Sequence, residues 1–223
     1  MSELLEIFNK YKTDKGYHHN YHIFYEDIFK EYKNNTDIKI LEIGICDGKS
    51  LLSWRDYFPH GLIYGIDIVK NIDLKDKNIF CYYGDSTNKE FINGCFNENM
   101  FDIIIDDGSH ACHHQLETLA NIFPFLKSNG TYIIEDCDWS FEPRISSHNK
   151  FWNNWNEILK NETTYDVLNK FKKSGIFKSK FISDLDNLYL QKKIKNINWW
   201  WKEKNTNIEL VKSRSSIFYL NKV

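Results

Sequence analysis

Acidic residues gather at two points of the sequence where an apolar run ends. Asp107 and His110 follow such a run in the segment FDIIIDDGSHACHHQ (101–115), and Glu135 and Asp136 end a second run, GTYIIED. If the two runs are neighbouring parallel strands, these carboxylates meet at one edge of the sheet and repel one another unless a cation neutralises them. Oxygen ligands favour Mg²⁺, Mn²⁺ or Ca²⁺ over zinc. We therefore predict a divalent metal held by Asp107, Glu135 and Asp136.

Asp106 and the nearby histidines complete this segment. Asp106 ranks behind Asp107 as a ligand, since adjacent strand residues point to opposite faces. A metal with open positions can chelate two adjacent hydroxyls and lower the pKa of one. His110 follows Asp107 by three residues and is the predicted base, because imidazole titrates near neutral pH; the alternative is an N-cap or a contact to a metal ligand. His113 and His114 are expected to face solvent or pack the next helix.

The segment LEIGICDGKS (41–50) predicts a cofactor-binding turn. Gly44 and Gly48 stand where a strand gives way to a helix, which lets a ligand approach the backbone and the helix N–H groups. The segment departs from the pattern GxGxxG, because Cys46 takes the place of the second glycine. A purely structural tight turn is the alternative interpretation.

Two further acidic residues close the next predicted strands. A carboxylate after the second strand can accept two hydrogen bonds from a ribose diol, so Asp67 is the predicted ribose ligand. Asp85 and Ser86 would border the adenine, with Ile68 as apolar cover. The alternative is that both aspartates cap the helices that follow them.

From residue 37 onward, predicted strands alternate with predicted helices, and these elements would position the residues named above. Short, nearly all-apolar runs predict parallel strands at 38–45, 62–68, 78–85, 101–106 and 130–136, and amphipathic stretches predict crossover helices at 49–58, 86–96 and 113–126. This pattern indicates an α/β fold with a doubly wound, mostly parallel sheet.

The two ends of the chain follow other patterns. Two N-terminal helices flank a polar and aromatic loop at 11–22, so we divide the chain into an N-terminal helical lid segment (1–36) and a main domain (37–223). A divergent substrate-binding region is expected at about 139–205, beginning with a loop and then a helix or two. The end, 207–222, predicts an antiparallel hairpin that turns near Ser213 to Ser216.

Composition narrows the classes of function. The chain has 223 residues, of which 42% are hydrophobic and 27% charged, and a net charge of −2 gives no footprint for nucleic acid or an anionic membrane. Five cysteines without a CxxC pair indicate neither a disulfide framework nor a zinc site. With no signal peptide and no membrane-spanning apolar run, the expected location is cytoplasmic.

Several of these segments together resemble a known family. The chain is similar to the class I S-adenosylmethionine-dependent methyltransferases, and more narrowly to the metal-dependent sugar O-methyltransferases of the macrocin and mycinamicin type, in YKTDKGYHHNYH, LEIGICDGKSLLSWRDYFP, YGIDI, GDS, IIIDDGSH and FPFLKSNGTYIIED. The resemblance covers roughly residues 11–139 and implies a mostly parallel seven-stranded sheet of the Rossmann-like methyltransferase fold.

The resemblance implies a cofactor, a metal and a reaction. S-adenosylmethionine would be the methyl donor, Mg²⁺ (or Mn²⁺) would lie on Asp107, Glu135 and Asp136 and bind vicinal hydroxyls of a sugar, and His110 would be the base. The loop Thr13 to Gly16 would close over cofactor and substrate, and self-association is a possibility because relatives often assemble. The residues expected at the cofactor are Thr13, Lys15, Glu42, Gly44, Gly48, Ser50, Asp67, Ile68, Asp85, Ser86 and Asp106.

Other interpretations stay open. A non-haem iron hydroxylase on the same fold would use His110, a neighbouring histidine and one carboxylate. A non-catalytic member would bind a nucleotide or a protein through aromatic surface. By analogy the acceptor is a nucleotide-linked or glycoconjugate hexose or heptose in polysaccharide or glycoside biosynthesis. Aromatic residues beyond 139 could stack on sugar faces or on a nucleotide base, but packing between helices is the favoured interpretation for most of them: Phe141, Trp152, Trp155 and Trp199 to Trp201.

Overall fold

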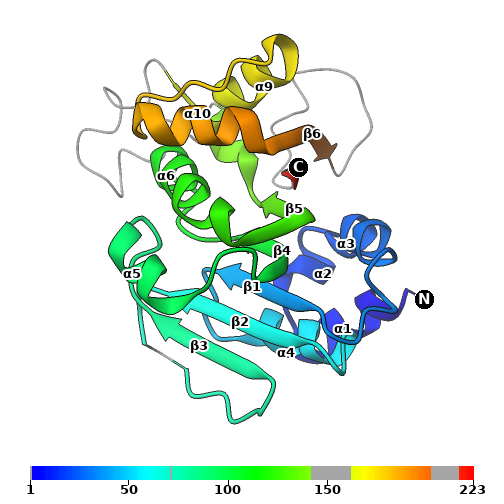
Figure 1. The fold of residues 1–223 in the computed structure, drawn as a ribbon. Coiled ribbons are helices and arrows are strands. Elements are labelled where there is room, and N and C mark those ends of the chain that lie inside the picture. The colour runs from blue at the N-terminus through cyan, green and yellow to red at the C-terminus, as the bar shows by residue number, and fades with distance from the viewer. Residues whose placement is uncertain (1, 71, 142–161, 202–215) are drawn as a thin grey trace.

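The computed structural model describes residues 2–70, 72–141, 162–201 and 216–223, and its centre is a seven-stranded sheet (Figure 1). The strand order is β3-β2-β1-β4-β5-β7-β6. The first five strands are parallel, and β7 runs antiparallel to both β5 and β6. The predicted doubly wound, mostly parallel seven-stranded sheet is thus confirmed. The strands are β1 Lys39–Ile43, β2 Leu62–Asp67, β3 Ile79–Tyr83, β4 Phe101–Asp106, β5 Leu126–Ile134, β6 Ile194–Trp201 and β7 Ser216–Lys222.

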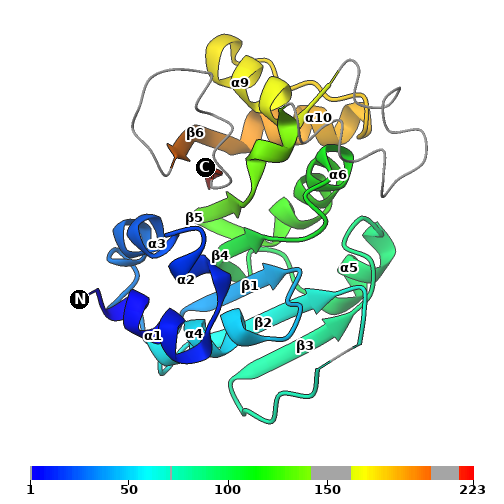
Figure 2. The same ribbon diagram turned by 180° about the vertical axis from the view of Figure 1, so that it is seen from behind.

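Two groups of helices cover the two faces of the sheet, as the opposite views of Figures 1 and 2 show. One apolar cluster joins α1, α3 and α4 to one face, and a second cluster joins α5, α6, α9 and α10 to the other. Strand residues contribute alternately, so Ile103 belongs to one cluster and Ile104 to the other. The helices are α1 Glu3–Tyr11, α2 Asp14–Tyr17, α3 His22–Phe29, α4 Lys49–Tyr57, α5 Lys89–Cys95, α6 Cys112–Ile122, α9 Thr164–Ser174 and α10 Asp184–Lys193, with short 3₁₀ turns η1 Phe123–Phe125 and η2 Cys137–Ser140.

The chain changes direction across the sheet between β1 and β4. It runs from β1 outward to β3, then returns to pair β4 with the other side of β1. In open parallel sheets, ligands bind in the crevice beyond the carboxyl ends of the strands at such a point. The ends of β1, β4 and β5 are joined directly, since the Asp107 amide after β4 donates to the Ile43 carbonyl of β1 at 2.9 Å and the Glu135 amide after β5 donates to the Asp106 carbonyl of β4 at 2.9 Å.

Local sequence explains where the crossover helices begin and end. The helix expected from residue 86 begins at Lys89, because the Asn88 side chain accepts from the amides of Glu90 and Phe91 as an N-cap. The helix expected at 113–126 ends at Ile122, where Pro124 lies in the 3₁₀ turn that leads into β5.

Two sequence expectations are corrected. The loop at 11–22 contains the one-turn helix α2, capped by the Thr13 side chain. The antiparallel end of the sheet exists, but the partner of β7 is β6 at 194–201, which the sequence left unassigned. The first strand and the turn of the predicted hairpin (207–215) lie outside the described residues. The same holds for residues 142–161 of the region where a loop and a helix or two were expected, and α9 follows these residues.

No helix within the described part of the chain is long and apolar enough to cross a membrane.

Candidate active site

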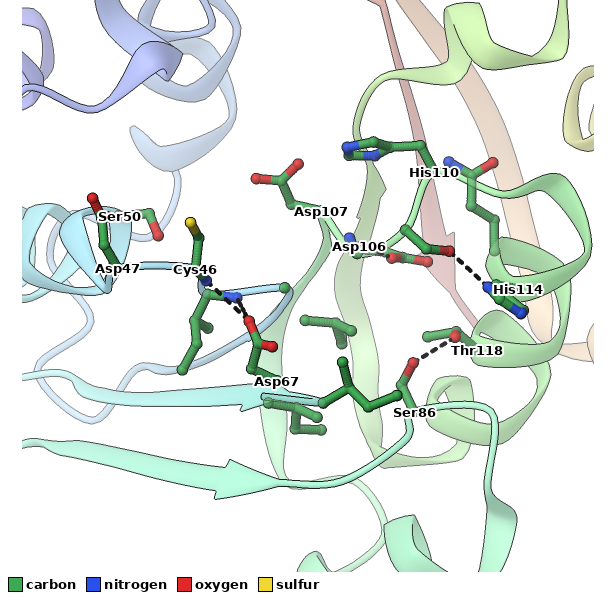
Figure 3. A pocket seen from close by; sticks show the side chains of 18 of the residues that line it. Cys46, Asp47, Ser50, Asp67, Ser86, Asp106, Asp107, His110, His114 and Thr118 are labelled. Atoms are coloured by element: carbon green, nitrogen blue, oxygen red, sulfur yellow. Dashed lines mark hydrogen bonds between the residues drawn. The ribbon is translucent and has the colours of Figure 1, made fainter. Parts of the chain in front are cut away.

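A cavity of about 730 Å³ opens beyond the carboxyl ends of β1, β2, β3 and β4 (Figure 3). It brings together eleven of the residues that sequence analysis selected: Thr13, Lys15, Gly44, Ser50, Asp67, Ile68, Asp85, Ser86, Asp106, Asp107 and His110. Residues that were not selected also line it, among them Asp14, Tyr17, Cys46, His114, Gln115 and Thr118. The position of this cavity is the one predicted for the cofactor.

The turn after β1 forms one wall of the cavity in a left-handed backbone conformation. Gly44, Cys46 and Gly48 have φ values of 81°, 45° and 75°. At Gly44 a Cβ atom would stand 2.1 Å from the carbonyl oxygen of Asp107, so only glycine lets the β1 turn approach the β4 turn this closely. Cys46 adopts the conformation that a glycine usually takes at this place.

Asp67 stabilises that turn. Its Oδ2 atom accepts from the amides of Ile45 and Cys46, each at 3.0 Å, and its Oδ1 accepts from the Val69 amide at 2.9 Å. The carboxylate also lines the cavity, as Figure 3 shows. The ribose contact stays a prediction beside this structural role.

Asp85 and Ser86 lie across the cavity from the turn. Asp85 Oδ1 accepts from the amide and the hydroxyl of Thr87, both at 2.8 Å, and thereby organises the loop before α5. The hydroxyls of Ser86 and Thr118 lie 2.8 Å apart on the cavity wall (Figure 3). The adenine contact is likewise still a prediction.

Two expected cofactor contacts do not reach the cavity. Glu42 is wholly buried, with Oε2 accepting from the Trp54 indole at 3.0 Å and Oε1 lying 3.4 Å from the Lys15 ammonium. Gly48 is the N-cap of α4, and a Cβ there would meet the Leu74 side chain at 2.8 Å. Neither Glu42 nor Gly48 lines the cavity, and both instead pack behind its wall.

The acidic cluster forms at the ends of β4 and β5, as predicted. Ligand atoms of Asp107, His110 and Asp136 all lie within 4.8 Å of one another, the only such group of metal-binding type in the described ranges. His110 Nε2 is 3.7 Å from Asp136 Oδ2. Glu135 lies beside this group but points into the interior, where it is 2% exposed.

Three side chains of the N-terminal segment form ion pairs or hydrogen bonds with oxygens of Asp107, Glu135 and Asp136. The Lys15 ammonium lies 2.5 Å from Asp107 Oδ2 and 2.7 Å from Glu135 Oε2. The Tyr21 hydroxyl donates to Asp136 Oδ1 at 2.5 Å, and the Tyr25 hydroxyl donates to Glu135 Oε1. Tyr21 and Tyr25 were not selected from the sequence, and Lys15 was expected in the loop over cofactor and substrate, not among the carboxylates.

Burial shapes the charge of the cluster. It raises the pKa of Glu135 well above its usual range; nearby Asp107 adds to the rise, and Lys15 opposes it. Burial also raises the pKa of Asp107, and that of Asp106 to about 7. For Lys15, burial lowers the pKa, but the charges of Asp107, Glu135 and Glu42 outweigh it and raise the pKa well above the usual value. The carboxylates thus need a cation in order to remain ionised together.

The predicted base His110 stands at the edge of this cluster. Its backbone is left-handed with φ of 59°, a conformation that histidine tolerates better than most residues. The imidazole stacks on Trp139 with 5.9 Å between ring centroids. Asp136 has a left-handed backbone as well, with φ of 51°. Such backbone strain is concentrated at functional sites.

The neighbouring histidines are divided between packing and the site. His113 packs on Phe181 with 5.8 Å between ring centroids, as one interpretation predicted. His114, expected outside the site, lines the cavity and lies 2.7 Å through Nδ1 from the Ser109 hydroxyl. His19 stacks on Tyr21 and lies 3.8 Å from Asp136 Oδ1.

The aromatic residues beyond β5 pack mainly on one another. Phe141 and Trp199 both contact Tyr165, with ring centroids 4.7 and 4.8 Å apart, and Trp200 contacts Tyr21 at 5.8 Å. This supports the packing interpretation. Trp152, Trp155 and the Trp201 side chain lie outside the described residues.

The donor chemistry of the acidic cluster fits a hard divalent cation. Asp107 and Asp136 offer carboxylate oxygens, the ligands that Mg²⁺ or Mn²⁺ prefers, and the His110 imidazole lies beside them. Glu135 is the neighbouring candidate for a further oxygen, and its ligand role stays a prediction.

Comparisons with known proteins find sugar methyltransferases. The chain is 34% identical over 150 residues to a mycinamicin VI 2''-O-methyltransferase of Micromonospora griseorubida, in an alignment covering 63% of this chain and 37% of that protein. It is also 34% identical over 154 residues to a demethylmacrocin O-methyltransferase of Streptomyces fradiae, covering 63% and 38%. No family model matches the chain.

A solved structure has the same fold over nearly the whole chain. The methyltransferase MycE of the mycinamycin pathway, crystallised with Mg, S-adenosylhomocysteine (SAH) and mycinamycin VI, superposes with a TM-score of 0.74 and 25% identity, over 99% of this chain and 54% of MycE. The chain has the fold and motifs of a class I methyltransferase. The resemblance found in the sequence, including its narrower likeness to sugar O-methyltransferases, is confirmed. The alignments cover well under half the length of these curated relatives, and nearly the whole chain superposes on 54% of MycE.

Proposed function

We propose that the chain transfers a methyl group from S-adenosylmethionine to a hydroxyl of a sugar, with a divalent metal at Asp107, Asp136 and Glu135. The observation that carries the proposal is the group of Asp107, His110 and Asp136 at the edge of a cavity of about 730 Å³. The named relatives are sugar O-methyltransferases, and the MycE crystals contain Mg and SAH. These findings support the same cofactors here.

The cavity supplies the cofactor site of this proposal. The nucleoside end would lie between Asp67 and Ile68 on one side and Asp85 and Ser86 on the other, and the sulfonium end would lie near Asp107. A carboxylate at the end of β2 suits a ribose diol, and the turn at Gly44 permits close approach to the backbone. Thr13 and Lys15 bring α2 to the opposite wall.

The metal, when bound, would orient two adjacent hydroxyls and lower the pKa of one. His110 accepts the proton at Nε2, and Asp136 Oδ2, 3.7 Å away, stabilises the imidazolium that forms. The new carbon–oxygen bond forms as the carbon–sulfur bond of the donor breaks, which leaves SAH. Most of the acceleration comes from alignment, because the sulfonium methyl is intrinsically reactive.

For the acceptor we propose a general class first, a sugar carried by a small molecule. Relatives act on sugars of macrolide and tetracenomycin glycosides according to their names, which supports a sugar on a small molecule. The sequence led to a more specific proposal for the acceptor, a nucleotide-linked or glycoconjugate hexose or heptose. Incubation with glycosides and nucleotide sugars, followed by mass spectrometry for the gain of one methyl group, separates these acceptors.

Substitution of the base tests the mechanism. His110→Ala should lower turnover about 10²- to 10⁴-fold, the usual contribution of a general base, while SAH affinity measured by calorimetry stays near that of the parent chain. The control is His113→Ala, which alters a histidine that packs on Phe181. Wild-type turnover in His110→Ala would remove His110 from the mechanism.

Chelation tests the metal. EDTA should abolish turnover, and Mg²⁺ or Mn²⁺ in excess should restore it. Full activity in EDTA would refute the metal assignment.

The donor set weighs against the iron hydroxylase. That chemistry needs two imidazoles and one carboxylate, whereas the group found in the described ranges has one imidazole and two carboxylates. A non-catalytic role predicts SAH binding without turnover on any sugar.

Cytoplasmic location and self-association stay predictions from the sequence.

A further inference from the structure

Lys15 is a cation enclosed among the carboxylates assigned to the metal. Its side chain is 2% exposed, and its ammonium lies 2.5 Å from Asp107 Oδ2, 2.7 Å from Glu135 Oε2 and 3.4 Å from Glu42 Oε1. These three carboxylates come from β1 and from the ends of β4 and β5, so one side chain joins three strands. The contacts bridge 92 residues to Asp107 and 120 to Glu135.

The helix that carries Lys15 is firmly seated. Thr13 caps α2 at its start, and a Cβ atom added to Gly16 would lie 2.9 Å from the Cβ of Phe8 in α1. At its other end the Tyr21 amide donates to the Lys15 carbonyl at 2.8 Å. The position of the ammonium is therefore a property of the fold.

The Lys15 ammonium takes the position between Asp107 Oδ2 and Glu135 Oε2 that a metal ion bound to both oxygens would need. A buried carboxylate pair requires a counter-charge, and Lys15 supplies it. A divalent ion that bound to Asp107 Oδ2 and Glu135 Oε2 would be a close neighbour of the ammonium, and the two cations would repel strongly in this poorly solvated place. Ion and ammonium are thus alternatives at these two oxygens.

We infer that Lys15 is a built-in counter-ion, which occupies Asp107 and Glu135 in the metal-free protein and leaves them when a divalent cation binds. This inference rests on the metal site of the proposed function. Lys15 lines the cofactor cavity together with Thr13, Asp14 and Tyr17, so rotation of its side chain away from the carboxylates changes the lining of that cavity while α2 stays in place. Metal loading and the lining of the cofactor site are thereby coupled through the Lys15 side chain.

Lysine reactivity in the unmodified chain tests the inference directly. The chain is acetylated briefly with an N-hydroxysuccinimide ester, with EDTA or with saturating Mn²⁺, and modified lysines are counted by mass spectrometry of peptides. Lys15 should be protected in EDTA and modified several-fold faster with Mn²⁺. Lys222, 4% exposed and bound to backbone carbonyls, should stay protected in both states, and the exposed Lys10 should react in both. Equal protection of Lys15 in both states would overturn the inference.

A binding measurement separates this inference from the proposed function. Lys15→Met removes the competing charge, so Mn²⁺ affinity followed by electron paramagnetic resonance of the free ion should rise at least about tenfold. Lys10→Met is the matched control and should leave the affinity unchanged. Equal affinity in Lys15→Met and the parent chain would overturn the counter-ion role and leave the metal site standing. Absence of Mn²⁺ binding in both would overturn the inference and the metal site together.

Stability provides a second readout if Lys15→Met folds poorly. Without metal this variant should unfold at a lower temperature than the parent, because buried carboxylates lose their counter-charge, and Mn²⁺ should raise its melting temperature more than that of the parent. A variant as stable as the parent in EDTA would contradict the role.

Discussion

Single residues at the site carry backbone conformations that their side chains do not favour. Cys46, His110 and Asp136 all have positive φ, and all three lie at the carboxyl ends of β1, β4 and β5. Histidine and aspartate tolerate this region, whereas cysteine has no such preference. The turn at Cys46 is kept in place by Asp67, which accepts from its amide. The cost of the conformation is therefore concentrated in Cys46.

Replacing Cys46 by glycine should stabilise the protein. The left-handed conformation costs a residue with a Cβ about 1–2 kcal/mol, while glycine loses about 0.4–1 kcal/mol through the greater freedom of the unfolded chain. Cys46→Gly should thus raise the free energy of unfolding by roughly 0.5–1 kcal/mol in urea titrations. Cys46→Ala keeps the Cβ and should bring no gain. An equal gain in both variants would show that the thiol, and not the backbone, is the source of the strain.

His114 should make stability sensitive to acid. Burial lowers the pKa of His114 below its usual value of 6.5, so the unfolded chain takes up this proton at a higher pH than the folded chain. The associated stability is present above about pH 6.5 and is lost as the pH falls through the lowered pKa of the folded state. Urea unfolding at pH 8 to 5 should show a shallower loss in His114→Gln than in the parent. His60→Gln, at an exposed position, is the control and should follow the parent.

At the scale of elements, buried central strands are easier to predict from the sequence than an edge strand or a helix of one turn. The strands β1, β2 and β4 are buried on both faces, so continuous apolar runs identify them. In contrast, β6 pairs on the edge of the sheet with a register shift between Ile194 and Asn196, and polar residues interrupt its pattern. The helix α2 is a single turn containing Gly16, too short to give a periodic signal.

The same reasoning explains which site residues the sequence could supply. Carboxylates at strand ends are visible because parallel strands end at one edge of the sheet. The partners Lys15, Tyr21 and Tyr25 reach them from 92 to 120 residues away, and no local pattern encodes such a contact. Glu42 fits the cofactor turn by spacing, but its side chain points behind the wall, toward Trp54.

Two glycines provide a matched test of how the turns meet. A Cβ at Gly44 would stand 2.1 Å from the Asp107 carbonyl oxygen, whereas a Cβ at Gly94 in α5 would meet nothing within 4 Å. Gly44→Ala should destabilise the fold by more than about 2 kcal/mol and weaken SAH binding, since it forces the β1 and β4 turns apart at a left-handed position. Gly94→Ala should stabilise the chain by about 0.5 kcal/mol through helix propensity. Calorimetry with SAH and urea unfolding check both; tight SAH binding by Gly44→Ala would contradict the close approach of the two turns.

At the scale of the whole molecule, the closing strand is fastened at the end of the sheet opposite the site. The Lys222 ammonium in β7 is 4% exposed and donates to the carbonyls of Leu126 at 2.6 Å and Pro124 at 3.0 Å, and to Asn99 Oδ1 at 3.0 Å. Burial lowers its pKa, which fits a cation held by neutral oxygens. One side chain thereby joins the last strand to the crossover between α6 and β5.

Because Lys222 satisfies buried carbonyls at the end of the sheet opposite the site, its removal should cost stability and leave the site intact. Lys222→Met strands buried acceptors, which should lower the free energy of unfolding by about 1–3 kcal/mol. Lys195→Met, exposed on the neighbouring β6, is the matched control and should change it by less than about 0.5 kcal/mol. SAH affinity should be the same in both variants, since the cavity lies beyond the opposite ends of the strands. A loss of SAH binding in Lys222→Met at a temperature where it is fully folded would mean that the antiparallel end of the sheet controls the geometry of the site.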